Sequence, residues 1–161
     1  PEIAMKLPIS TIVAAVHIDD DLADGVLRTA IALSQRLGAN LHVVDAYPAL
    51  KSVGYPYARR PEATEVEEHR SARDQVVKKL EARVKALNGE ANIAAPVGNE
   101  SDSLRLYLES TSADLLVIGT HQKSFWDKLL TKSVSSELAH EAPCAVMLVP
   151  PDFAARIARA A

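Results

Sequence analysis

Cysteine and aromatic residues are scarce in this chain of 161 residues. It has a single cysteine, Cys144, and aromatic residues make up 4% of the sequence. One cysteine excludes an internal disulfide and fits a reducing compartment such as the cytoplasm. Because Cys144 lies between Pro143 and an apolar segment, we interpret it as a packed thiol rather than a reactive one.

Long apolar runs are missing as well. No segment approaches the ~18 consecutive apolar residues of a membrane-spanning helix. The first residues also lack the apolar core of a secretory signal peptide. We therefore expect a cytoplasmic protein that has no membrane partner.

An excess of basic charge is also absent, since the formal net charge is −3. This balance argues against a nucleic-acid partner, which would require a basic face. Four of the five histidines, His42, His69, His121 and His140, show no metal-ligand spacing, so we predict no metal site. No serine lies in a G-x-S-x-G frame, so we predict no catalytic residues and no enzymatic activity.

Apolar segments alternate with amphipathic ones along the whole chain. The composition, 48% hydrophobic and 24% charged, is typical of one globular domain spanning residues 1–161, with a core at 8–149 and a C-terminal extension at 150–161. The alternation predicts an α/β fold, a parallel sheet with helices on both faces. The strands are expected at residues 10–16, 41–46, 91–97, 115–118 and 145–149, and the helices at residues 22–37, 64–87, 101–111 and from 133 to near Pro143.

Several residues mark the expected helix ends. Gly38 has the position of a C-terminal cap, and Thr64 with Glu67 fits a capping box at the start of a long helix. The segment 150–161 forms either a short helix or a frayed tail. In a parallel α/β sheet a ligand binds beyond the carboxyl ends of the strands, so the loops that begin at His17, Tyr47 and Gly119 are the candidate site.

Five segments in this order resemble the universal stress protein family over residues 8–149. They read STIVAAV (10–16), ALSQRLGANLHVVDA (32–46), VGNESDSL (97–104), SADLLVIGTH (112–121) and KSVSSELAHEAPCAVMLV (132–149). The resemblance implies a five-stranded parallel sheet of order 3-2-1-4-5. It also implies a homodimer joined through the last strand, formed by Ala145, Val146, Met147, Leu148 and Val149, and an exposed apolar edge strand favours such pairing.

The nucleotide-binding branch of that family has the pattern G-x2-G-x9-G-S/T. Here Gly119 matches the first glycine and Ser133 the last position, but Gln122 and Lys132 replace the second and third glycines. Glycine allows positive φ and a close approach of phosphate to the backbone amides. The two side chains therefore restrict the loop, and we predict that ATP does not bind in the usual mode.

Three further positions complete the family's site. Val134, beside Ser133, is retained. His17 stands near the position where the branch has an aspartate next to the ribose, and Ala46 lies where backbone groups meet the adenine. Two interpretations of His17 stay open: a ligand contact that titrates near neutral pH, or a polar side chain at a strand end.

Three functional hypotheses stay open. The first is a dimeric stress-response or regulatory protein without a cofactor. The alternative is a stress sensor that binds ATP or AMP through altered contacts, with slow hydrolysis; a flavin- or adenine-binding relative of similar topology is a third.

For Lys132 and Ser133, a residual anion site and a simple helix cap both remain open. Phe125 and Trp126 either fill the pocket, pack under the loop or face a partner.

Overall fold

The computed structural model describes residues 7–48, 60–120 and 143–160. The predictions for the helix beginning at Ser133, for Phe125 and Trp126, and for most of the loop after Pro48 fall outside these ranges. Within the described residues, no helix combines the length and the apolar character needed to cross a bilayer.

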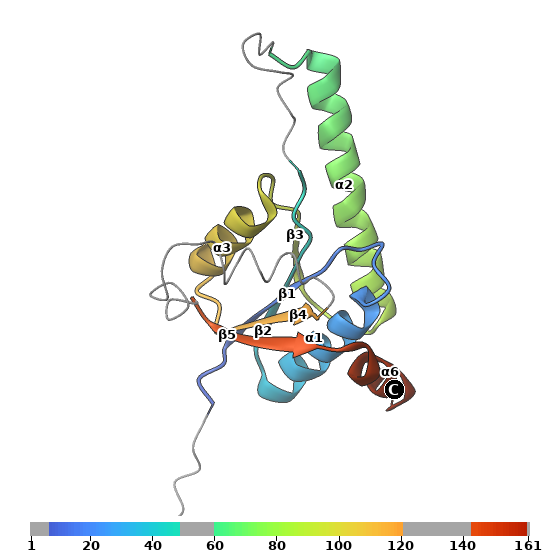
Figure 1. Cartoon of the computed structure of the whole chain (residues 1–161), viewed down its shortest axis with the longest axis vertical. Helices are drawn as coiled ribbons and strands as arrows, with labels where there is room; N and C mark the ends of the chain where they lie inside the picture. Colours follow the sequence, from blue (N-terminus) through green and yellow to red (C-terminus); the bar gives the residue numbers. More distant parts are fainter. Residues whose placement is uncertain (1–6, 49–59, 121–142, 161) are drawn as a thin grey trace, which may run out of the picture.

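Five parallel strands form one sheet at the centre of the molecule (Figure 1). Their order is β3-β2-β1-β4-β5, which confirms the predicted topology. The chain therefore moves outward from β1 to β3, crosses back to β4 beside β1, and ends at the opposite edge. The strands are β1 (Thr11–Ala15), β2 (Asn40–Val44), β3 (Asn92–Ala94), β4 (Leu115–Gly119) and β5 (Ala145–Val149).

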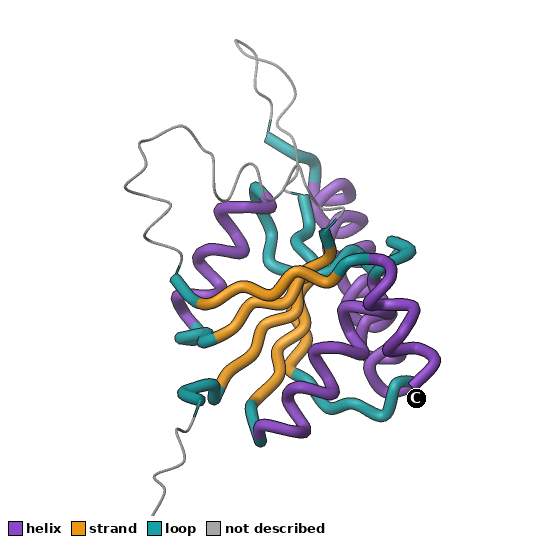
Figure 2. Tube along the Cα trace, turned by 60° about the horizontal axis from the view of Figure 1, so that its bottom comes forward, coloured by secondary structure: helices purple, strands orange, loops and turns teal. Residues whose placement is uncertain are grey.

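Helices cover both faces of the sheet, as predicted (Figure 2). On one face α1 (Ala23–Leu37), α2 (Ala63–Ala86) and α6 (Pro151–Ala160) contribute to one apolar core. On the other face α3 (Glu100–Ser110) packs against a second core. The long helix α2 extends well beyond the sheet at its N-terminal end (Figure 1).

The neighbouring strands β1 and β4 supply residues to both cores. In β1, Ile12 and Ala14 belong to the α1-side core, whereas Val13 belongs to the α3-side core, and all three are fully buried. Such two-sided burial is typical of parallel sheets. Each aliphatic side chain removed from water in this way stabilises the fold by roughly 1.5–3 kcal/mol.

β2 and β3 are shorter than predicted. β2 ends at Val44 and not at Ala46, and β3 covers three residues rather than the predicted 91–97. Pairing reappears only at an isolated bridge between Tyr47 and Val97. Pro96 precedes this bridge and has no N–H to donate to a ladder, which accounts for the interruption.

The N-cap of the long helix α2 is Glu62, two residues before Thr64, so the predicted capping box at Thr64 and Glu67 is wrong. Glu62 is the last extended residue, with ψ 157°, and the carboxylate of Glu65 accepts the N–H of Glu62 at 2.7 Å. Glu62 and Glu65 thus form the capping box, with the same three-residue spacing as Thr64 and Glu67. In contrast, the prediction for Gly38 is confirmed, because it caps α1 with a left-handed φ of 64°.

The C-terminal segment forms a docked helix rather than a frayed tail. α6 presents Phe153 and Ala154 to the α1-side core. At the contact, a Cβ placed on Gly25 would lie 2.2 Å from the Cβ of Ala154. Only glycine at position 25 lets the two helix backbones approach this closely.

Cys144 is partly buried beside the α3-side core. Burial is the largest effect on its thiol and raises the pKa above the ordinary value. A raised pKa favours the protonated, unreactive form, in keeping with a packed thiol.

The carboxylate of Asp114, just before β4, is hydrogen-bonded to the start of β1. Its Oδ2 accepts the N–H of Ser10 at 2.8 Å, the hydroxyl of Ser10 at 3.0 Å and the N–H of Thr11 at 3.0 Å. These hydrogen bonds, first those from the backbone, lower the pKa of Asp114 below its ordinary value of 3.8. The ionised carboxylate therefore stabilises the register in which β1 and β4 begin together.

We expect Asp114→Asn to lower the free energy of unfolding at neutral pH but not in acid. Because the pKa is lowered in the folded state, the ionised group contributes stability above the unfolded value, and this contribution is lost as the pH falls through the folded value. The free energies of unfolding of both proteins in urea, measured from about pH 3 to about pH 7, check this. Glu109→Gln, at an exposed carboxylate on α3, is the control; a difference between parent and Asp114→Asn that does not shrink in acid would contradict the expectation.

Candidate functional site

The carboxyl edge of the sheet is the candidate site because β1 and β4 are neighbours there. The chain leaves these two strands in opposite directions, and such a switch point leaves a crevice in α/β sheets. His17 follows β1, Asp45 follows β2 and Gly119 is the last residue of β4. The start of α3 lies at the same edge, since α3 follows the carboxyl end of β3.

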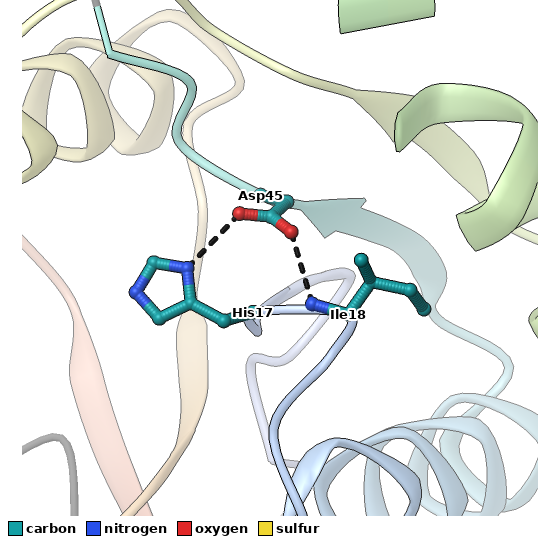
Figure 3. Close-up of polar contacts among 3 residues, drawn as sticks. All are labelled: His17, Ile18 and Asp45. Atoms are coloured by element: carbon teal, nitrogen blue, oxygen red, sulfur yellow. Dashed lines mark hydrogen bonds and ion pairs between the residues drawn. The ribbon is translucent and has the colours of Figure 1, made fainter. Parts of the chain in front are cut away.

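A histidine and a buried aspartate meet at this edge (Figure 3). Asp45 Oδ1 lies 3.1 Å from His17 Nδ1, and Oδ2 accepts the N–H of Ile18 at 3.0 Å. A carboxylate accepts hydrogen bonds, so the tautomer of His17 with its proton on Nδ1 is the one that can donate to Asp45. One carboxylate therefore fixes both the ring of His17 and the backbone that follows it.

The two side chains differ in their access to solvent. The side chain of Asp45 is 11% exposed, whereas that of His17 is 44% exposed. A buried carboxylate is tolerated because both of its oxygens have donors. Asp45 thus acts as a support, and the imidazole of His17 is the group of the pair that a ligand at the edge would meet first.

The N-terminus of α3 has its first donors already satisfied. Asn99 Oδ1 accepts the N–H of Ser101 at 3.1 Å and that of Asp102 at 3.3 Å. Free N–H groups in the first turn are what bind a phosphate, and here a side-chain cap uses two of them. An anion at this position would have to displace the side chain of Asn99.

The other predicted site residues divide into two groups. Gly119 is buried and paired with Val149, and Ala46 is partly exposed between Asp45 and Tyr47. The structure thus places His17, Ala46 and Gly119 at one edge of the sheet. Gln122, Lys132, Ser133 and Val134 lie outside the described residues, so their roles stay predictions.

Asp45 was missed because the segment LHVVDA was interpreted as a strand to its end. The available signal was that a charged residue follows an apolar strand, just as His17 does. Carboxyl ends of neighbouring parallel strands share an edge, so the two residues could have been paired.

Within the described residues no cluster of three or more His, Cys, Asp or Glu side chains is arranged to hold a metal ion.

Comparison with known proteins identifies this architecture. Residues 8–150 match the model of the universal stress protein family. The chain belongs to this family. A search of curated proteins found no match.

Solved universal stress proteins share the fold. One, in complex with cAMP, has a TM-score of 0.59 at 20% identity over 87% of this chain and 96% of that chain. A family protein from Burkholderia pseudomallei has a TM-score of 0.58 at 22% identity, covering 88% of this chain and 96% of that one. One from Archaeoglobus fulgidus, in complex with dAMP, has a TM-score of 0.52 at 19% identity, covering 88% and 98%. Identities this low establish a common fold and leave the ligand of this chain to be argued from its own residues.

We expect Asp45→Asn to destabilise the protein by about 1–3 kcal/mol, since the amide offers one acceptor oxygen where two donors now bind. The NMR signals of the His17 ring should shift in the same variant. Asp19→Asn is the matched control, because the side chain of Asp19 is 88% exposed and its Oδ1 lies 3.9 Å from Lys79 Nζ. Equal unfolding free energies for the two variants would contradict the supporting role of Asp45.

Proposed function

We propose that this universal stress protein is a regulatory protein of the cytoplasm that does not bind ATP through the family's glycine loop and is not an enzyme. The observation that carries the proposal is the substitution of Gln122 and Lys132 for two glycines of the G-x2-G-x9-G-S/T frame. A side chain at each position restricts φ and occupies space that phosphates would need. The lysine has a suitable charge for an anion, so the argument is steric.

The described part of the edge supports the same proposal. Asn99 occupies two N–H groups of the α3 N-terminus, and Asp45 adds a buried carboxylate beside His17. Like charges repel more strongly where water is excluded. Both features disfavour a polyphosphate at this end of the sheet.

We expect Gln122→Gly combined with Lys132→Gly to increase ATP affinity by about tenfold or more, equivalent to ~1.4 kcal/mol. Isothermal titration of the parent and the double variant measures this. The alanine pair, Gln122→Ala with Lys132→Ala, is the matched control: it removes most of the bulk but keeps the restriction on φ. An unchanged affinity in the folded glycine variant would refute the steric account.

The second candidate is a sensor of adenine nucleotides. What favours it is that two solved relatives were obtained with cAMP and dAMP, which are monophosphates and place a smaller demand on a phosphate loop. His17, partly exposed at the switch point, would then contact the ligand. A nucleotide that copurifies with the protein, or a rise in melting temperature with ATP or AMP, would favour this candidate over the first.

We also propose that the protein is a homodimer joined through β5. Among the strands of the described residues, β5 is an edge strand paired with β4 alone, and Leu148 on it is 46% exposed. Toward β4, the N–H of Ala145 donates to Asp114 and the carbonyl of Val149 accepts from Thr120. Since successive residues of a strand alternate, the peptide groups of Val146 and Leu148 face the outer edge, where a second copy would pair.

We expect Leu148→Pro to yield a monomer in sedimentation, because proline removes an N–H from the outer edge and spares the ladder with β4. Leu148→Ala keeps that N–H and should remain dimeric. Val146 is less suitable for this test, because it packs against the α3-side core. A dimeric Leu148→Pro variant, or a monomeric parent, would rule out pairing through this edge.

A further inference from the structure

The outer edge of β5 is complementary to a second copy of itself. β5 lies at the front edge of the sheet in Figure 1, and among the described strands β4 is its one neighbour. A strand edge presents N–H and C=O groups in alternation, so two such edges can pair. The register of the pair decides which residues of the two copies meet.

The direction of the peptide groups limits the possible registers. Ala145 and Val149 hydrogen-bond on the β4 side, and alternation leaves Val146 and Leu148 for the outer edge. Identical edges pair about a twofold axis, and an axis perpendicular to the sheet makes the two strands antiparallel. In an antiparallel pair, outward-facing residues stand opposite one another and exchange hydrogen bonds. The register can therefore change only in steps of two residues.

Pro150 and Cys144 disfavour the registers on either side of the central one. With Leu148 opposite Leu148 of the second copy, Val146 would face Pro150, which has no N–H to donate. With Val146 opposite itself, Leu148 would face Cys144, which lies in a bend before the strand. With Val146 opposite Leu148, every outward peptide group of β5 finds a partner within the strand.

The side chains match in this central register as well. Val146 packs against the α3-side core, and Leu148 points to the same side of the strand, so each Leu148 is covered by Val146 of the second copy. On the other side Met147 packs against the α1-side core and meets Met147 of the second copy at the axis. No residue of β5 is charged, so no like charges oppose each other across the pair.

Building on the homodimer proposed above, we propose that the two copies pair with Met147 on the twofold axis and Val146 opposite Leu148. Met147 then forms a non-hydrogen-bonded pair, in which the two Cα atoms lie about 4.5 Å apart. The two copies of Leu148 are offset by two residues along the strands, roughly 7 Å, in addition to the spacing between the strands. The same offset separates the two copies of Val146.

The test is a set of three single cysteines, each placed in a Cys144→Ala background and oxidised in air. A disulfide requires Cα atoms about 4.4–6.8 Å apart. Met147→Cys should therefore migrate as a covalent dimer on a non-reducing gel. Val146→Cys and Leu148→Cys are the matched controls and should migrate as monomers, because their Cα atoms lie beyond that reach.

Sedimentation of the reduced parent distinguishes a failure of the register from a failure of the homodimer. A monomeric parent refutes both. A dimeric parent whose Val146→Cys or Leu148→Cys variant forms the covalent dimer instead overturns the register and leaves the homodimer standing. Parent dimers of mixed isotope labelling give a second readout without substitution: we expect an NOE between the methyl groups of the two copies of Met147, and its absence also overturns the register.

Discussion

The parallel pairing of β1 with β4 is the constraint on which the rest of the molecule depends. It joins Ile12 to Leu115, Val13 to Leu116 and Ala14 to Val117 in register, and it brings together segments about a hundred residues apart. Because the chain departs from these strands in opposite directions, their pairing makes the carboxyl edge a topological switch point. The carboxylate of Asp114 secures the other end of the same pair.

The sheet separates two kinds of surface. All five strands run in the same direction, so every carboxyl end lies at one edge and every amino end at the other. The first edge has His17 and the buried Asp45, and the second has the carboxylate of Asp114 beside the start of β1.

Much of the fold could be predicted from the sequence because apolar runs and helix caps are local signals. The segment 145–149 was predicted to the residue, and Gly38 was correctly placed as a cap. The start of α2 was not, because Glu62 with Glu65 and Thr64 with Glu67 both have capping-box spacing, and only the backbone of Glu62 decides between them. Asp45 was missed for a different reason: its role depends on a neighbour on another strand, which no single segment reveals.

The contact between Gly25 and Ala154 links the last helix to the first. Its consequence is evolutionary: the two positions are tied as a pair. A lineage that acquires any residue larger than glycine at position 25 needs glycine at position 154, a displaced α6, or no α6 at all. Relatives that keep the glycine should accordingly be those that also keep a small residue in a helix after the fifth strand.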